Sequence, residues 1–374
     1  MNPLDGLAHA SQQTHRYERI ALVSLFDPSR NSFGFLRILL ATAVIVSHAW
    51  PLGGFGPDPG REFNNLGILA VECFFALSGF LIARSGERLT VGRFLWHRMV
   101  RIFPGLWVAL LFVALFAAPA VWRASQPLTQ YPLAEPGPLG YILNNVFLQN
   151  AQQGIGDTLA TNPFPSMWNG PLYTLPYEFL CYLLVAALIA FRALGPRSVA
   201  ILCAATWIFL QLQEFGALGL VDTRQARFTL MFFAGALIYF WREQLLHRRR
   251  WWIPVLAGVV VVLSYLTIGF IQVGLIALAY IFIWTGSVLP LHRIGTRRDY
   301  SYGMYIYGWP VLQLATFWGL NKLGLPIYLA IVLLASLVLA MASWHLVESR
   351  ALRTKSMSLP RWLAPVDSPA AAGR

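Results

Sequence analysis

Three ionisable side chains, His48, Glu72 and Glu178, stand inside long apolar runs of the sequence. A charged group in a membrane helix costs at least about 2.5–3.5 kcal/mol, so such residues usually mark a functional site. At a rise of about 1.5 Å per residue, the three are expected about 6, 9 and 10 Å from the outer ends of three different helices. This shared depth predicts a buried polar site. The alternative is structural: a histidine hydrogen-bonded near a helix end, and glutamates paired with Arg37 or with indole and hydroxyl groups.

Arg37 is a fourth such residue and lies eleven positions before His48 in the same apolar run. Eleven steps of about 100° return two side chains to nearly the same face of a helix, about 16 Å apart along its axis. The spacing therefore predicts a polar channel with a guanidinium near its cytoplasmic end and an imidazole toward its outer end.

A basic segment, RSGERLTVGRFLWHRMVRIFPGLW, connects the second and third apolar runs. We expect it to be a cytoplasmic loop in which Arg98 and Arg101, three positions apart, form a pair of guanidinium groups with Arg93 nearby. Guanidinium groups bind phosphate oxygens well, which favours a phosphorylated ligand approaching from the cytoplasm. Contact with anionic lipid headgroups explains the same residues equally well.

The composition indicates whether these residues belong to a soluble protein or to a membrane protein. Of the 374 residues, 57% are hydrophobic and 12% charged, and the mean hydropathy is +0.57. A soluble domain carries roughly twice that charged fraction, so the sequence indicates an all-α integral membrane protein. The net charge of +12 is assigned to orientation in the membrane and not to nucleic-acid binding. The three cysteines lie in apolar runs, and neither disulfides nor a metal are expected.

About ten transmembrane helices are predicted from apolar runs that can cross, or nearly cross, about 30 Å of hydrocarbon. With both termini cytoplasmic, 22 of the 28 Lys and Arg residues fall on the cytoplasmic side and five on the outer side, where Arg227 is counted. We expect a cytoplasmic N-terminal segment at 1–32, a membrane domain at 33–346 and a cytoplasmic tail at 347–374, disordered toward its end. The predicted spans are 33–52, 66–83, 102–121, 171–191, 199–213, 226–241, 251–269, 272–289, 300–319 and 325–346.

Four motifs resemble those of the integral-membrane acyltransferase family 3, whose members O-acylate bacterial sugars and related acceptors. The similarity covers residues 30–352 in the family's order. Its motifs are Arg37 to His48 in FGFLRILLATAVIVSHAWP, Glu72 and Ser78 in AVECFFALSGFLI, Arg98 and Arg101 in HRMVRIFP, and Trp168, Asn169, Tyr177 and Glu178 in WNGPLYTLPYEFLCYLL, followed by SYGMYIYGWPV with Tyr305 and by HLVESR.

The resemblance implies acyl transfer from cytoplasmic acyl-CoA, with acetyl-CoA the expected donor, to a glycan or glycolipid hydroxyl outside the bacterial inner membrane. It gives His48 the role of general base, or of a transiently acylated residue, and Glu72 or Glu178 the role of orienting it. Arg37, Arg93, Arg98 and Arg101 would hold the donor, and Ser78, Trp168, Asn169, Tyr177 and Tyr305 would contact substrate. No metal is implied, and the oligomeric state stays open.

One position departs from the family pattern. Gly308 stands where many members carry a histidine, which leaves His48 as the candidate base. A different class of function, a proton-coupled transporter or flippase for a lipid-linked sugar, would use His48 and the buried glutamates as a proton relay. Such a protein has no need of a phosphate-binding arginine pair on the cytoplasmic side, and this difference favours the acyltransferase.

Overall fold

The computed structural model describes residues 25–61, 64–216, 223–267, 269–296 and 298–356. Within these residues the regular structure is almost entirely helical, as predicted, and the strands are a two-residue pair, β1 (Gly60–Arg61) with β2 (Asn64–Asn65). In this described part of the chain, six helices are long and apolar enough to cross a membrane, and Trp252–Leu266 is a shorter apolar helix. The protein is therefore a multi-pass membrane protein. The count of ten crossings and the cytoplasmic location of both termini stay predictions.

Each of the ten predicted segments contains a helix in its described residues. In chain order they are α2 (Phe33–Gly53), α3 (Leu66–Gly86), α4 to α5 (Val91–Trp122), a 3-10 turn with α7 (Gly170–Ala190), α8 (Pro196–Glu214), α9 (Arg224–Phe240), α11 (Trp252–Leu266), a π-helical turn with α12 (Phe270–Val288), α13 (Ser301–Phe317) and α14 to α15 (Leu325–Arg353). Short helical elements lie between them: α6 (Pro138–Leu143), α10 (Arg242–Leu245) and 3-10 turns at Leu128–Leu133, Leu320–Leu323 and Thr354–Ser356.

The basic segment was predicted to be a loop, but most of it is helical in the structure. Because α3 continues to Gly86 and α4 already begins at Val91, the two helices are joined by residues 87–90. Thr90, in an extended conformation, precedes the first turn of α4. Arginine, leucine and methionine are good helix formers, and their propensity extends the apolar span into the basic segment. Arg93, Arg98 and Arg101 therefore project from a continuous helix.

The chain forms two compact units, each built from segments that are separate in the sequence. Unit 1 comprises residues up to Leu36, Glu72–Ala83 and Gly195–Arg297. Unit 2 comprises Arg37–Val71, Arg84–Leu194 and the residues from Arg298 onward. The predicted limits of a single membrane domain at 33–346 stay a prediction, and the segments 1–24 and 357–374 lie outside the described residues.

Unit 1 is held together by a very close crossing of α3 and α9. A Cβ atom added at Gly79 would lie 1.8 Å from the carbonyl oxygen of Phe232, and one added at Gly235 would lie 1.9 Å from that of Ala76. The two backbones are thus in direct contact, as small residues allow in membrane helix pairs. Helix α9 also packs against α8 and α12, and α12 packs against α11.

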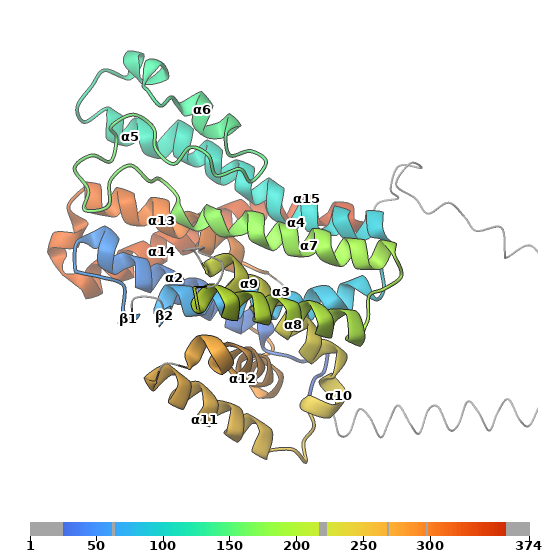
Figure 1. The fold of residues 1–374 in the computed structure, drawn as a ribbon. Coiled ribbons are helices and arrows are strands. Elements are labelled where there is room, and N and C mark those ends of the chain that lie inside the picture. The colour runs from blue at the N-terminus through green and yellow to red at the C-terminus, as the bar shows by residue number, and fades with distance from the viewer. Residues whose placement is uncertain (1–24, 62–63, 217–222, 268, 297, 357–374) are drawn as a thin grey trace, which may run out of the picture. The chain divides into compact units, whose positions relative to one another are not determined.

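Unit 2 contains α4, α7, α13 and α14 together with most of α2. Helix α4 packs along α7, and α13 packs along α14 and against α4, as Figure 1 shows. The end of α2 is tied to α13 because Thr316 donates a hydrogen bond of 3.0 Å to the carbonyl of Leu52. Nearly all of α13 between Ser301 and Thr316 is buried, so this helix lies in the core of the unit.

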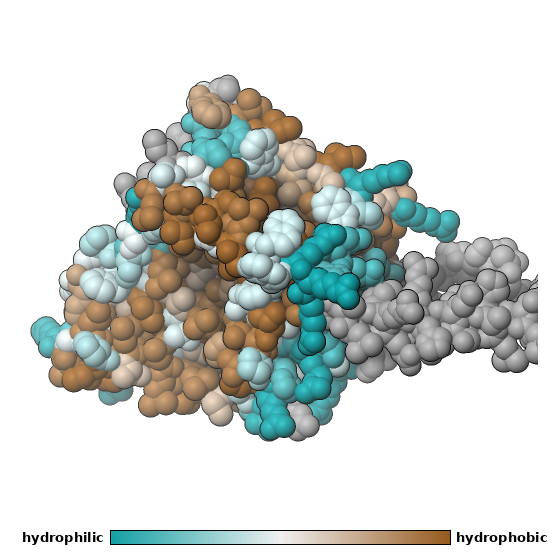
Figure 2. Space-filling model, turned by 90° about the horizontal axis from the view of Figure 1, so that it is seen from below, coloured by the Kyte–Doolittle hydropathy of each residue, from teal (hydrophilic) through white to brown (hydrophobic). Residues whose placement is uncertain are grey.

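Large apolar side chains cover much of the outside of the described residues. Figure 2 shows brown hydrophobic residues over much of one face, with hydrophilic side chains gathered in separate patches. Phe116, Ile201 and Leu334 are each at least 65% exposed. Apolar surface of this extent is typical of helices that face lipid.

Candidate active site

His48 lies near the end of α2 and faces a carboxylate that the sequence analysis did not select. Its Nδ1 is 3.5 Å from Oδ1 of Asp58, in the loop between α2 and β1, and each side chain is 25% exposed. The same Asp58 oxygen accepts a hydrogen bond of 2.7 Å from Ser47, the neighbour of His48 in the chain. The imidazole also packs against the indole of Trp309 of α13 in a T-shaped arrangement, with 4.9 Å between ring centroids. The imidazole thus lies beside both an aspartate and an indole.

Gly308 of α13 allows α2 to approach at this level. A Cβ atom there would lie 2.6 Å from Cγ1 of Ile45, one turn before His48. A histidine at position 308 would therefore require the Ile45 side chain to move. The departure from the family pattern thus has a structural counterpart in this close helix contact.

The basic residues of unit 2 gather around Asp299, which lies directly before α13. Oδ2 of Asp299 accepts hydrogen bonds from Nη2 of Arg101 at 2.6 Å and from Nη1 of Arg37 at 2.8 Å. Burial alone would raise the pKa of Asp299, but Arg101 and Arg37, with hydrogen bonds from Ser301, lower it to about 2. Arg37 and Arg101 are therefore joined through one carboxylate that is charged at neutral pH.

A second acidic residue, Glu348, lies close to Arg101. Glu348 is 3% exposed, lies in the π-helical turn Trp344–Glu348, and accepts a hydrogen bond of 2.8 Å from Ser343. Its Oε2 is 3.9 Å from Nη1 of Arg101, whose guanidinium also stacks 5.3 Å from the ring centroid of Tyr302. Single π-helical turns are frequent at functional sites, and this one fixes the carboxylate behind the guanidinium.

Arg98 is less completely paired than Arg101. Its guanidinium carbon lies 5.8 Å from the ring centroids of both Phe94 and Tyr182, while its buried Nε has no hydrogen-bond partner among the described residues. Tyr182 donates a 2.5 Å hydrogen bond to Glu178, on the same helix α7. The structure thus places Glu178 beside the aromatic residue that packs on Arg98. Arg93 lies exposed on α4.

The segment after α15 adds a lysine to this basic cluster. Trp96 donates a hydrogen bond of 3.3 Å to the carbonyl of Thr354, and Nε2 of His97 lies 3.3 Å from that of Lys355. Burial, together with the nearby charges of Arg98, Arg101 and Arg37, lowers the pKa of Lys355 to about 8, and Asp299 offsets only part of this shift. We call Arg37, Arg98, Arg101 and Lys355, with Asp299 and Glu348, the inner cluster. Its four cations exceed its two acids, so it favours an anionic ligand.

Glu72 belongs to unit 1 and is engaged in a buried ion pair. Nε and Nη2 of Arg227 both lie 2.6 Å from its Oε1, and the two side chains are 0% and 2% exposed. Arg227, which the charge count placed on the outer side, thus lies buried in unit 1, because α9 begins at Arg224 and carries this arginine. Ser78 lies two turns further along α3 and is partly exposed.

The residues expected to contact substrate after the outer loop are mostly buried in hydrogen-bonded packing. Trp168 is 0% exposed and donates to Thr158 at 2.9 Å, and the amide of Asn169 donates to the carbonyl of Ile306 at 2.8 Å. The Tyr305 hydroxyl lies 2.8 Å from that of Thr174. Tyr177, on α7, is partly exposed and its ring lies 6.4 Å from that of Tyr173. The contacts of Asn169 with Ile306 and of Thr174 with Tyr305 connect the two ends of the 3-10 turn Gly170–Thr174 to α13.

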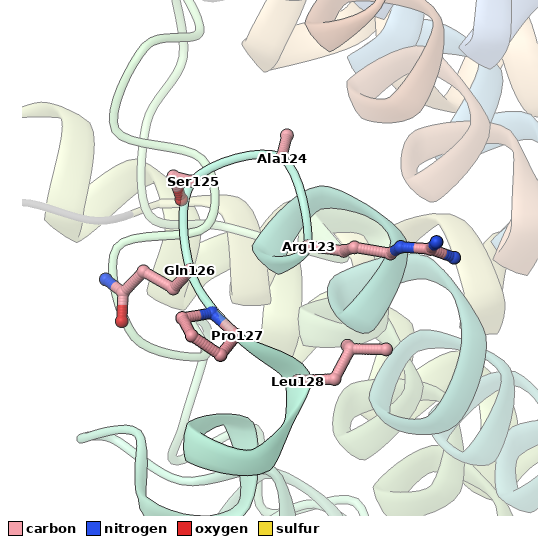
Figure 3. A pocket seen from close by; sticks show the side chains of 6 residues that line it. All are labelled: Arg123, Ala124, Ser125, Gln126, Pro127 and Leu128. Atoms are coloured by element: carbon pink, nitrogen blue, oxygen red, sulfur yellow. The ribbon is translucent and has the colours of Figure 1, made fainter.

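An open hollow of about 730 Å³ lies at the turn after α5. Figure 3 shows its lining, a single run of chain from Arg123 to Leu128, in which the side chain of Arg123 points away from that of Gln126. None of the predicted site residues belongs to this lining. The hollow is therefore separate from the two clusters described above.

Comparison with known sequences gives one family and full-length relatives. The profile of an acyltransferase-domain family, acyltransferase family 3, matches residues 30–345. An "O-acetyl transferase" of Shigella phage Sf6 is 28% identical over 347 residues, which cover 88% of this chain and 98% of the relative. "Nodulation protein 10" of Rhizobium leguminosarum bv. viciae is 24% identical over 366 residues, covering 90% and 96%. No solved structure matches the chain significantly.

Proposed function

This chain belongs to acyltransferase family 3 and is an acyltransferase, and from that premise we propose that it transfers an acyl group from cytoplasmic acyl-CoA to a sugar hydroxyl outside the inner membrane. Its full-length similarity to a protein named as an O-acetyl transferase supports an O-acyltransferase and makes acetyl the first acyl group to test. The acceptor proposed is a glycan or glycolipid.

The proposal is carried by the two polar clusters that α2 connects within unit 2. Arg37 joins the inner cluster through Asp299, and His48, eleven residues later on the same helix, faces Asp58. At about 1.5 Å per residue the two groups are about 16 Å apart along the axis. One cluster suits the phosphates of a donor and the other suits proton transfer at an acceptor hydroxyl.

The inner cluster is the proposed donor site. CoA carries several phosphate charges, and guanidinium groups bind such oxygens with two parallel hydrogen bonds. Arg98 offers the buried Nε that lacks a partner among the described residues, and Arg101 is held in place by Asp299 and Glu348. Arg93, exposed on α4, would meet the donor as it approaches.

His48 is the proposed general base. Its Nδ1 faces Asp58, which leaves Nε2 to accept the proton of the acceptor hydroxyl. The hydroxyl oxygen then forms a C–O bond to the thioester carbonyl carbon, the C–S bond breaks, and the departing thiolate takes the proton from the imidazolium. Glu178 and Glu72 stay candidates for a supporting role, each already bound to a tyrosine or an arginine.

The test uses purified protein reconstituted in lipid with acetyl-CoA and a panel of oligosaccharide acceptors. The proposal expects thiol release that depends on both the acceptor and His48, and an acetylated product by mass spectrometry. His48→Ala should abolish transfer, whereas His292→Ala, which alters a histidine outside both clusters, should retain it. Substrate movement across the bilayer without thioester cleavage would instead identify a transporter.

A further inference from the structure

Asp58 is a charged residue that neither the family resemblance nor the apolar pattern of the sequence selected. Because it is the carboxylate next to the proposed base, we propose that Asp58 is the positioning residue of His48, orienting the imidazole and stabilising its protonated form. This inference rests on the proposed function and adds the residue through which His48 acts.

The position of Asp58 is fixed by the residue next to His48. Ser47 is 0% exposed and donates its hydroxyl proton to Oδ1 of Asp58 at 2.7 Å, while its Oγ accepts the backbone N–H of Gly67 at 2.9 Å. The absence of a side chain at Gly67 allows this close approach, because a Cβ atom there would lie 3.0 Å from the Ser47 Oγ. A chain of hydrogen bonds therefore ties the aspartate to α2 and to the first turn of α3.

The chemistry of the contact matches what a base requires. A carboxylate at Nδ1 selects the tautomer with its proton on Nδ1, leaves Nε2 able to accept a proton, and stabilises the resulting imidazolium. Burial would raise the pKa of Asp58, but the hydrogen bonds from His48 and Ser47 outweigh it and lower that pKa, so the side chain is charged at neutral pH. Asp58 thus supplies a fixed negative charge at the nitrogen that does not react.

The two glutamates predicted for this role have other partners in the structure. Glu178 accepts a hydrogen bond from Tyr182, and Glu72 is bound by Arg227 in unit 1. The ring of His48 instead has Asp58 on its Nδ1 side and packs against the uncharged Trp309 from α13. Asp58 therefore fills the position that the sequence analysis gave to a glutamate.

The decisive experiment compares Asp58→Glu with Asp58→Asn in the reconstituted enzyme. A positioning charge predicts that Asp58→Asn, which keeps the shape and the hydrogen bond from Ser47, lowers kcat about 100-fold or more with KM for acetyl-CoA unchanged. Asp58→Glu, which restores the charge on a longer side chain, should recover at least a tenth of the wild-type kcat. Asp157→Asn, at an exposed position of the outer loop, serves as the matched control.

A packing role gives the opposite order, because the asparagine fits the space and the glutamate does not. Asparagine activity equal to or above that of glutamate would therefore overturn the proposal, as would a change confined to KM. Thermal unfolding of each variant in detergent identifies any loss that comes from misfolding. Lack of acyl transfer by the wild-type protein would contradict the proposed function itself, so the two failures are distinguishable.

Discussion

Arg101 and Asp299 are 198 positions apart in the chain and meet with 2.6 Å between Nη2 and Oδ2. Arg37 binds the same oxygen, so the start of α13 connects α2 with α4. The aspartate cancels one of two positive charges while holding both guanidinium groups in place. The inner cluster is therefore organised before any ligand arrives, which reduces the cost of ordering long side chains on binding.

The Asp299 carboxylate should stabilise the protein in a pH-dependent way. Its folded pKa of about 2 lies below the value of about 3.9 expected in the unfolded chain, so its contribution is present above pH ~4 and is lost as the pH falls toward 2. Asp299→Asn should therefore lower the melting temperature at pH 7 and lose that difference near pH 2. Thermal unfolding in detergent measures this, and an Asp157→Asn control should show no such difference.

Arg98 should contribute to donor binding more than to turnover. Arg98→Ala is expected to raise KM for acetyl-CoA about tenfold or more with a smaller change in kcat, because the phosphate contact is lost. Arg88→Ala removes the same charge from the exposed linker between α3 and α4 and is the control for net charge. Equal KM values for the two variants would assign Arg98 to lipid contact or orientation.

Lys355 should make donor affinity depend on pH in the mildly alkaline range. Since its pKa is lowered to about 8, the ammonium loses its proton as the pH rises through that value, and the attraction for phosphate falls. We expect KM for acetyl-CoA to rise between pH 7 and 9 in the wild type and to rise less in Lys355→Arg, whose charge persists. Kinetics at fixed ionic strength measure it, and parallel profiles would contradict it.

Glu72 and Arg227 should stabilise unit 1 only when both are present. Arg227→Met leaves a buried carboxylate without its cation and should destabilise the protein by about 3–5 kcal/mol. The double variant Glu72→Met and Arg227→Met should recover much of that loss, because apolar residues of similar size replace both charges. Thermal unfolding measures the recovery, and acyl transfer by the double variant would contradict a catalytic role for Glu72.

The residues that the sequence analysis selected share one property, a charge inside an apolar run. That signal found Arg37, His48, Glu72 and Glu178, because the membrane makes each of them costly. The length of the apolar runs located the ten long helical segments of the described residues. Neither signal could find Asp58 or Asp299, which lie in polar loops where an acidic residue is ordinary.

Residues near helix ends were also difficult to place from the sequence. Arg227 was counted on the outer side, although the predicted span 226–241 contained it, and the structure shows it in a buried ion pair within α9. Glu348 and Lys355 were included in the tail because polarity rises there, whereas the π-helical turn and the hydrogen bonds to Trp96 and His97 bring both against α4. These contacts depend on three-dimensional packing and leave no local pattern.

The crossing of Gly79 and Gly235 has a consequence for permeation. Since neither position has space for one methyl group, no sugar, lipid tail or pantetheine arm fits between α3 and α9 where these glycines lie. The two helices are in direct backbone contact here, and replacing either glycine with alanine would force them apart. Any conduit for an acyl chain must therefore run along other helix faces.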